Sequence, residues 1–334
     1  MKLLVTGGAG FIGSAFVRLA IAEGISVVNL DKLTYAGNPE NLLSIAQSPL
    51  YTFVKGDICD AHVVRALLGD HKPDGIVHFA AESHVDRSIL SPFDFFETNL
   101  RGTFTLLEAA RAHKLARFVH VSTDEVYGSL KAPLEADEEY PLVTNSPYSA
   151  SKAGSDLLAR SYFKTYQLPV LITRASNNYG PYHFPEKLIP LMIMNAFEDR
   201  ALPVYGDGQQ IRDWLYVEDH VRGILSVFSS GKEGEIYNIG GNRSLPNLDV
   251  VRMILQLTRK PESLIQYVAD RPGHDQRYAL NSSKLTQATG WSPQMHFEEG
   301  LAKTVEWYRT NPAWVNNVRS GAYRDFYVQN YANR

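Results

Sequence analysis

The stretch Lys2-Leu-Leu-Val-Thr6-Gly7-Gly-Ala-Gly10-Phe-Ile-Gly13 decides the fold. Residues 2–6 form the short apolar run that is typical of a buried parallel strand, and a helix is predicted to run from the glycines to about Glu23. Between strand and helix the glycines follow the pattern G-x-x-G-x-x-G, which allows a tight turn and lets the backbone approach a pyrophosphate at the helix N-terminus. We predict a dinucleotide site that includes Gly7, Gly10 and Gly13; a glycine-rich turn that binds nothing is the alternative.

The residue that ends the second predicted strand indicates which dinucleotide binds. This strand, residues 26–30, leads into Asp31, eighteen residues beyond Gly13. A carboxylate here accepts hydrogen bonds from an adenosine ribose and repels a 2′-phosphate, which favours NAD over NADP. Lys32 weakens that preference, because a base could receive the phosphate. We expect NAD as the cofactor.

Strands and helices alternate along the first 180 residues, which predicts an α/β fold with a doubly wound parallel, Rossmann-type sheet. After Pro181 the elements become shorter and mixed. We therefore predict an NAD-binding domain with the catalytic residues over 1–180, and a smaller mixed α/β substrate domain over 181–334, with some chain crossing back to the sheet. The remaining predicted strands are 51–54, 75–79, 118–121, 170–173, 202–205, 214–217 and 235–239; the helices are 61–68, 92–113, 147–166, 188–197, 218–228, 248–258 and 297–308.

Two of these helices carry apolar stripes. In the 92–113 helix, Phe96, Leu100, Phe104 and Leu107 recur at helical spacing and are predicted to face the sheet. In the 147–166 helix the predicted stripe is Ala153, Leu157 and Leu158. Ser146 is a plausible N-cap and Pro147 suits the first helical position. A second apolar face could pair two subunits.

Composition narrows the class of protein. The chain has 334 residues, 44% of them apolar, and a net charge of −3, which argues against bulk nucleic-acid binding. No apolar run approaches the roughly 18 residues of a membrane span. We expect no signal peptide, because Met1-Lys2 leads directly into the first predicted strand. The single cysteine, Cys59, excludes an internal disulfide framework, fits a cytoplasmic location and is expected to be a small apolar filler. We expect no metal.

Chemistry is concentrated in two motifs. Thr123, Asp124 and Glu125 follow the predicted strand 118–121, at the sheet edge where ligands bind in open α/β folds. Tyr148 and Lys152 are four residues apart, so a helix places them on one face. The lysine ammonium and the positive nicotinamide of NAD+ are expected to lower the pKa of Tyr148, which could then deprotonate a sugar hydroxyl while hydride leaves the same carbon. Thr123 could orient that hydroxyl.

The adjacent carboxyls add a second reaction. Once a carbonyl has formed, Glu125 could remove the proton from the neighbouring carbon, and Asp124 could protonate a hydroxyl that leaves one carbon further on. Two carboxyls in one pocket tend to separate their pKa values into an acid and a base. Because adjacent strand residues point in opposite directions, both can reach one ligand only if the backbone turns here. Two solvated loop carboxylates are the alternative.

Further polar residues follow other predicted strands. Asp57 and Ile58 come just after strand 51–54, where an adenine could lie. Glu82, Asp86 and Arg87 follow strand 75–79, and they indicate either a wall of the site or a structural ion pair. In the second region, loops carry Arg212, Arg271 and Arg277, which suit bidentate phosphate recognition but could equally be surface arginines.

Seven motifs give the sequence a resemblance to the extended short-chain dehydrogenase/reductase family, and within it to sugar-nucleotide 4,6-dehydratases that act on dTDP-glucose. The resemblance covers nearly the whole chain, and the Thr-Asp-Glu triplet and the Ala-Glu-Ser-His-Val-Asp-Arg-Ser run are its most specific parts. The motifs are Thr6-Gly-Gly-Ala-Gly-Phe-Ile-Gly13, Asp31-Lys-Leu-Thr-Tyr-Ala-Gly-Asn38, Ala80-Ala-Glu-Ser-His-Val-Asp-Arg-Ser88, Ser122-Thr-Asp-Glu-Val-Tyr-Gly128, Tyr148-Ser-Ala-Ser-Lys152, Arg174-Ala-Ser-Asn-Asn-Tyr-Gly-Pro181 and Arg271-Pro-Gly-His-Asp275.

The resemblance implies oxidation of C4 by NAD+, loss of water across C5 and C6, return of hydride to C6, and a homodimer formed through the two long helices. It also implies site residues for each ligand. NAD would be held by Phe11, Ile12, Asp31, Lys32, Leu33, Thr34, Asp57, Ile58, Ala80, Ala81, Glu82, Ser83, Thr98, Tyr148, Lys152 and Asn178. The sugar nucleotide would be held by His84, Thr123, Asn177, Lys187, Leu188, Pro203, Val204, Tyr205, Arg212, Asn247, Asp270, Arg271, Pro272, Gly273 and His274.

Three other functions stay open on sequence alone. A sugar-nucleotide 4-epimerase shares the cofactor, the tyrosine and the lysine, but needs no proton transfer at C5 and C6. A UDP-glucose 4,6-dehydratase differs only in the base, because thymine and uracil differ by one methyl, worth about 1 kcal/mol of burial. A non-catalytic NAD-binding regulator would be expected to have lost Tyr148 or Lys152, and both are present.

Overall fold

The computed structural model describes residues 1–319, and its centre is a seven-stranded sheet in the order β10-β6-β5-β4-β1-β2-β3. All neighbouring strands pair in parallel, which confirms the predicted doubly wound sheet. The strand order reverses between β1 and β4, so a crevice opens there at the carboxyl ends of the strands. The strands are β1 (Lys2–Thr6), β2 (Ser26–Asp31), β3 (Tyr51–Lys55), β4 (Gly75–His78), β5 (Phe118–Thr123), β6 (Val170–Ala175) and β10 (Ile236–Ile239).

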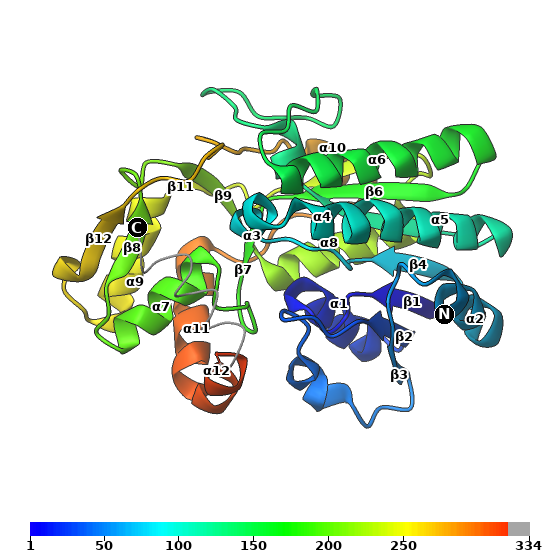
Figure 1. The fold of residues 1–334 in the computed structure, drawn as a ribbon, viewed down its shortest axis with the longest axis horizontal. Helices are drawn as coiled ribbons and strands as arrows, with labels where there is room; N and C mark the ends of the chain where they lie inside the picture. The colour runs from blue at the N-terminus through cyan, green and yellow to red at the C-terminus, as the bar shows by residue number, and fades with distance from the viewer. Residues whose placement is uncertain (320–334) are drawn as a thin grey trace.

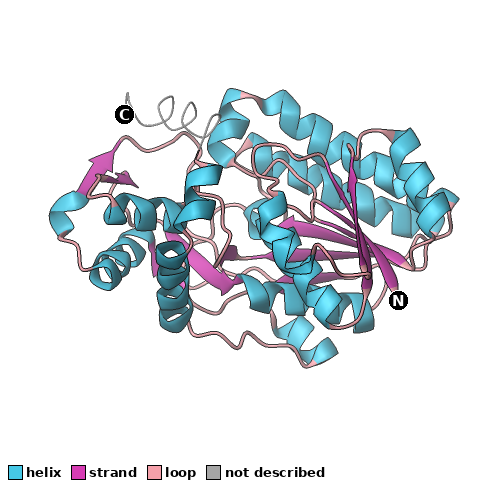
Figure 2. Cartoon of the chain, turned by 90° about the horizontal axis from the view of Figure 1, so that it is seen from below, coloured by secondary structure: helices cyan, strands magenta, loops and turns pink. Residues whose placement is uncertain are grey.

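Helices cover both faces of this sheet (Figure 2). The first strand explains why: Leu3 and Val5 point into one apolar cluster and Leu4 into another, so both faces must be buried. Helices α1 (Phe11–Ala22) and α8 (Val217–Ser230) cover the first face, with Phe16 and Ile224 in its core. Helices α2 (Ala61–His71), α5 (Thr103–Ala112) and α6 (Pro147–Tyr166) cover the second.

Helix α6 begins as the sequence predicts. Ser146 is the N-cap, and it exchanges hydrogen bonds with Ser149 in a capping box, Ser149 N to Ser146 Oγ at 3.1 Å and Ser146 N to Ser149 Oγ at 3.1 Å. Pro147 occupies the first helical position. This start fixes the rotation of the helix, and with it the side on which Tyr148 and Lys152 lie.

The predicted 92–113 helix is interrupted by a π-type turn. It consists of α4 (Pro92–Phe95), the π segment η2 (Phe96–Gly102) and α5. The predicted stripe is partly wrong: Leu107 is buried as expected, but Phe96 is 51% exposed and Phe104 is 47% exposed, whereas Phe95 and Leu106 are buried. The extra residue of a π turn rotates the side chains that follow it, among them Phe104, while Phe96 stands at its start. Leu157 of α6, also predicted as core, is 56% exposed.

The C-terminal region forms a second body with its own core (left in Figure 1). Helix α8, helix α10 (Ser283–Thr289) and strand β10 return to the main sheet. Conversely, strand β7 precedes residue 181 but pairs with β9 of the C-terminal region. The predicted second domain extends beyond the described residues at 320–334. The other elements are α3 (Val85–Leu90), α7 (Leu188–Phe197), α9 (Asn247–Thr258), α11 (Phe297–Thr310), α12 (Pro312–Val318), β7 (Asn177–Tyr179), β8 (Leu202–Tyr205), β9 (Ile211–Tyr216), β11 (Ser244–Pro246), β12 (Ile265–Val268), and short helical turns at Pro39–Ile45, Asp124–Tyr127 and Glu262–Leu264.

No helix within residues 1–319 combines the length and apolar character that crossing a membrane requires.

Candidate active site

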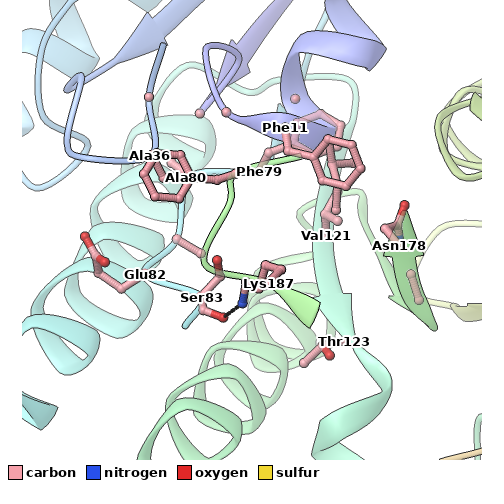
Figure 3. A pocket seen from close by; sticks show the side chains of 18 of the residues that line it. Phe11, Ala36, Phe79, Ala80, Glu82, Ser83, Val121, Thr123, Asn178 and Lys187 are labelled. Atoms are coloured by element: carbon pink, nitrogen blue, oxygen red, sulfur yellow. Dashed lines mark hydrogen bonds between the residues drawn. The ribbon is translucent and has the colours of Figure 1, made fainter. Parts of the chain in front are cut away.

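A cavity of about 350 Å³ lies at the carboxyl ends of the central strands. Its walls come from the glycine loop after β1, the ends of β2, β4, β5 and β6, the start of α6, and the segment 183–189 (Figure 3). This is the crevice beside the reversal of strand order, where ligands bind in open α/β sheets. The cavity therefore brings residues from both regions of the chain together.

The glycine loop presents bare backbone to the cavity. Gly7 has a φ of 73°, a conformation that side chains disfavour, and a Cβ on Gly13 would collide with the Gly7 carbonyl oxygen. Gly8 N donates to Asn29 Oδ1 at 3.0 Å, which ties the loop to β2. The predicted loop residues Gly7, Gly10, Phe11, Ile12 and Gly13 all line the cavity.

The end of β2 carries the predicted ribose ligand. Asp31 Oδ2 accepts from Ala9 N at 2.9 Å and Oδ1 accepts from Leu33 N at 2.8 Å, so the carboxylate is fixed at the cavity wall. Burial raises the pKa of Asp31, and these two backbone bonds oppose the rise. Lys32 Nζ lies 2.7 Å from Asp57 Oδ2, so this base already has an anionic partner, which supports the preference against a 2′-phosphate.

Most of the residues predicted for the cofactor meet in this one cavity. Leu33 is the exception: it has a φ of 56° and does not line the cavity. Near Glu82, the backbone is held by Asn99, whose Oδ1 accepts from Glu82 N at 2.8 Å. The remaining lining members of the predicted set are Asp31, Lys32, Thr34, Asp57, Ile58, Ala80, Ala81, Glu82, Ser83, Thr98, Tyr148, Lys152 and Asn178.

The backbone turns at the end of β5, as the two carboxyls require. The strand ends at Thr123 and a 3₁₀ turn begins at Asp124; Thr123 Oγ1 caps it, accepting from Glu125 N at 3.3 Å. The same hydroxyl lies 3.2 Å from Asp124 Oδ1. Both Asp124 and Glu125 line the cavity, so the turn that the sequence only permitted is confirmed.

The two carboxyls have different surroundings. Burial raises the pKa of Asp124 well above its usual range, and the charges of Glu125 and Asp213 raise it further. Burial also raises the pKa of Glu125, but three cations oppose the rise: Arg271, Lys187 and Arg212. Asp124 is thus favoured as a neutral acid, while Glu125 is favoured as the carboxylate of the pair.

Tyr148 and Lys152 lie at the cavity from one face of α6. Burial and the neighbouring carboxylates, Glu125 first, raise the pKa of Tyr148, while a hydrogen bond with Thr123 lowers it. In the protein without cofactor the pKa of Tyr148 is therefore raised, whereas the sequence analysis expected it to be lowered. That expectation included the charge of a positive nicotinamide. Burial lowers the pKa of Lys152 to about 8, and its ammonium donates to Val121 O at 2.9 Å.

The residues predicted for the sugar nucleotide divide into two groups. Thr123, Asn177, Lys187 and Leu188 line the cavity, and Lys187 Nζ donates to Ser83 O at 2.8 Å across it (Figure 3). The others do not line it, although several connect to it indirectly through charge or hydrogen bonds. This second group is His84, Pro203, Val204, Tyr205, Arg212, Asn247, Asp270, Arg271, Pro272, Gly273 and His274.

Polar members of the second group, together with Asp86, form what we call the polar layer. Arg271 Nη1 lies 3.2 Å from Asp86 Oδ1, and Tyr205 OH donates to Asp86 Oδ2 at 2.8 Å. His274 Nδ1 lies 2.6 Å from Asp270 Oδ1. Asp86 therefore joins the run after β4 to the loops of the C-terminal region.

Sequence reasoning predicted Lys187 and Leu188 but missed the residues just before them, 183–186. The His183 ring stacks on Phe11 with centroids 4.1 Å apart, and Glu186 Oε1 accepts from Tyr35 OH at 3.1 Å. Arg87 Nε also donates to Glu186, at 3.0 Å. Only a polar and aromatic run directly after Gly-Pro hinted at this wall. Ser176, Phe184, Trp214 and His220 are other lining residues that were not predicted.

These residues fit a dinucleotide. Among residues 1–319, the buried polar atoms of cavity-lining side chains that have no hydrogen-bond partner include Asp124 Oδ2, Asn177 Oδ1, His183 Nδ1, Trp214 Nε1 and His220 Nε2. Unsatisfied groups of this kind are costly unless a ligand or water completes them. Together with the bare glycine loop and the fixed Asp31, they make the cavity suitable for a polar cofactor and a polar substrate.

A family model described as GDP-mannose 4,6 dehydratase matches residues 4–304. The curated "dTDP-glucose 4,6-dehydratase 1" of Escherichia coli (strain K12) is 55% identical over 360 residues, which cover 100% of both chains. The chain belongs to the dTDP-glucose 4,6-dehydratase family. The dTDP-glucose 4,6-dehydratase of Xanthomonas campestris pv. campestris (strain B100) is 54% identical, covering 96% of this chain and 97% of its own. The resemblance to the extended short-chain dehydrogenase/reductase family is thereby confirmed.

Solved structures extend the comparison. A dTDP-glucose 4,6-dehydratase from Streptomyces venezuelae, solved with NAD bound, superposes with a TM-score of 0.93 at 51% identity, covering 95% of this chain and 100% of that one. The Thermus thermophilus UDP-glucose 4-epimerase, also solved with NAD, has a TM-score of 0.87 at 32% identity, covering 93% and 100%. Dehydratases and epimerases thus share this fold, and the site chemistry must separate them.

Proposed function

We propose that the protein is an NAD-dependent 4,6-dehydratase that converts dTDP-glucose to dTDP-4-dehydro-6-deoxyglucose, a precursor for deoxysugar biosynthesis. One observation carries the proposal: the turn after Thr123 puts Asp124 and Glu125, whose neighbouring charges differ, into the same cavity as Tyr148. An epimerase has no use for this pair. The full-length similarity to dTDP-glucose 4,6-dehydratases supports the same reading.

NAD is the proposed cofactor, held by the glycine loop, by Asp31 and by the walls after β3 and β4. When bound, it supplies a hydride acceptor for C4 and a hydride donor for C6, so the reaction has no net oxidation or reduction. We assign the first domain, residues 1–180, to NAD and catalysis, and residues 181–334 to most of the sugar nucleotide.

Tyr148 begins the reaction as a base. It takes the proton of the C4 hydroxyl as the C4 hydride leaves, and Thr123, which hydrogen-bonds to Tyr148, orients that hydroxyl. Lys152, buried one turn along α6, supplies the positive charge that stabilises the phenolate.

Elimination follows at the next two carbons. The C4 carbonyl acidifies the C5 proton, which Glu125 removes as its carboxylate. The C6–O bond breaks, and Asp124 gives its proton to the departing hydroxyl, so one water leaves. Asp124 and Glu125 end this step with their protonation states exchanged. Glu125 then gives its proton to C5 as the hydride taken from C4 is returned to C6, and Asp124 regains one proton while Tyr148 releases one, which resets the site.

The sugar nucleotide is proposed to lie between Lys187 and the loop that carries Arg271. Arg212 is buried and Arg271 is partly buried, and both act on Glu125 by their charge. They suit a diphosphate at the edge of the C-terminal region. His84, Tyr205 and His274 belong to the same polar layer and are proposed to position these arginines.

We also propose a cytoplasmic homodimer. Exposed apolar side chains gather on two neighbouring helical segments of the second sheet face: Phe93, Phe96 and Phe104 on α4–η2–α5, and Leu157 on α6. A four-helix interface would cover them. Light scattering behind size exclusion tests this assembly, and a monomer at micromolar concentration would refute it.

Two other sugar-nucleotide functions compete with this proposal. A 4-epimerase would interconvert gluco and galacto isomers at constant mass, and a UDP-glucose 4,6-dehydratase would prefer the uracil nucleotide. The test is a mass spectrum of dTDP-glucose after incubation with the purified protein, with NADH absorbance followed in the same sample. Loss of one water without net NADH is the expected result, at a higher kcat/KM than with UDP-glucose. An unchanged mass would overturn the proposal.

A further inference from the structure

Helix α6 carries a third charged residue in line with the two that face the cavity. Tyr148, Lys152 and Asp156 follow each other at four-residue spacing, so they lie on one face of the helix. Lys152 lines the cavity, while Asp156 lies one turn further in and is 1% exposed.

The surroundings of Asp156 fix it as a carboxylate. Arg174 Nε on β6 donates to Asp156 Oδ2 at 2.9 Å, and His120 Nε2 on β5 lies 3.3 Å from Oδ1. Arg174 is itself held by Tyr127, whose phenol oxygen accepts from Nη1 at 2.9 Å. These contacts, opposed by burial, lower the pKa of Asp156 to about 2.

Lys152 needs such an anion. It is 4% exposed, and burial favours the neutral amine of a lysine. Two imidazoles face its charge from the sheet, His78 on β4 and His120 on β5; burial and the Lys152 charge lower the pKa of both, so they stay neutral. Asp156 is the group whose charge opposes the effect of burial on Lys152.

We propose that Asp156 is a positioning residue for the oxidation step: anchored by Arg174 and His120, its buried carboxylate holds Lys152 as an ammonium beside Tyr148. The role of Asp156 in oxidation rests on the proposed function, but the effect of its charge on the Lys152 pKa does not depend on that function. Tyr148 loses its proton more readily next to an ammonium than next to an amine, so the effect passes from Asp156 through Lys152 to the phenol.

The first test measures Lys152 directly. In protein labelled with [ε-¹³C]lysine, the Lys152 signal is assigned by its loss in Lys152→Met and titrated against pH without substrate. We expect a pKa of about 8 in the wild type, and a value lower by about one unit in Asp156→Asn, since the raising charge is gone. An unshifted Lys152 titration in Asp156→Asn would overturn the proposal.

Two further variants separate charge from packing. Ser155→Ala removes a buried neighbour of Asp156 that contacts His120 Nε2 at 3.1 Å, without changing any charge, and should leave the titration in place. Asp156→Glu restores the carboxylate and should recover most of the shift. If Arg174 without its anion prevents folding, Asp156→Asn/Arg174→Met removes both charges and should lower the Lys152 pKa in the same direction. An equal shift in Ser155→Ala would assign the effect to packing and refute the proposal.

The catalytic consequence is tested by the pH profile. The alkaline limb of the rate of C4 oxidation should move to lower pH by about one unit in Asp156→Asn and stay unchanged in Ser155→Ala. A shifted NMR titration with an unmoved limb would refute the positioning role. Absence of any dehydration by the wild-type protein would instead refute the proposed function, so the two failures are distinguishable.

Discussion

The two regions that meet at the cavity differ in how they contribute to it. The sheet region supplies side chains and backbone that line the cavity directly, among them Tyr148, Asp124 and Glu125. Most residues of the C-terminal region that were predicted to bind the sugar nucleotide do not line the cavity. Among them, Arg212 and Arg271 influence Glu125 by charge. Under the proposed mechanism, the sheet region would perform the proton transfers, and the C-terminal region would adjust the pKa values of the groups that perform them. Variants in the first should abolish steps, and variants in the second should shift pH dependence or affinity.

The largest effect is expected from Tyr148→Phe in the sheet region. Removing the phenol removes the base for C4 oxidation, and kcat should fall roughly 10³-fold. Stopped-flow absorbance should detect no early NADH. Tyr166→Phe, on the exposed end of the same helix, is the matched control and should be unaffected. Retention of most activity in Tyr148→Phe would assign the base elsewhere.

Glu125→Gln should separate the two proton transfers of the sheet region. Oxidation at C4 can proceed, but the C5 proton has no acceptor, so dehydrated product should form roughly 10²-fold more slowly while NADH accumulates. Absorbance and product mass are followed together. Glu139→Gln alters an exposed glutamate and serves as the control. Normal turnover in Glu125→Gln would remove this residue from the mechanism.

Arg271→Gln tests whether the C-terminal region acts by charge. Arg271 lowers the pKa of Glu125, so its loss should raise that pKa, and the base is then protonated at higher pH. The acid limb of kcat should move up by roughly one pH unit. Arg252→Gln on α9, where the side chain is 43% exposed, should leave the limb in place. A change in KM with an unmoved limb would make Arg271 a substrate ligand only.

Tyr35→Phe is expected to have the smallest effect, at a point where the two regions touch. It removes the hydrogen bond from Tyr35 to Glu186 at the cavity wall. One hydrogen bond contributes about 1 kcal/mol, so NAD should dissociate about fivefold faster. Release is measured by fluorescence after dilution, with Tyr267→Phe on exposed β12 as the control. Unchanged release would mean that this contact does not retain the cofactor.

The sheet and its glycine loop could be predicted because local rules decide them. Apolar runs bounded by glycines give the strands, and Ser146-Pro147 defines the start of α6. The spacing of Tyr148 and Lys152 then needs no tertiary information. Because side chains alternate along a strand, Asp124 and Glu125 can face one ligand only if the backbone turns after Thr123, and it does.

Other features depend on contacts that local patterns do not contain. The π turn in residues 96–102 changes the direction of the side chains that follow it, so the exposure of Phe104 could not be recognised from regular helical spacing. The ion pair of Arg87 with Glu186 joins residues 99 apart, and that of Asp86 with Arg271 joins residues 185 apart. The layered placement of Arg212 and Arg271 likewise follows from how the C-terminal region docks on the sheet.

The bond between Tyr35 and Glu186 has a consequence for metabolism. It joins the loop after β2 to the segment after Pro181, and both line the cavity where NAD is proposed to lie. Each catalytic cycle restores the oxidant that it began with, so a retained cofactor never has to exchange with the surrounding pool. The flux through such an enzyme would follow the supply of sugar nucleotide and stay insensitive to the NADH/NAD+ ratio of the cell.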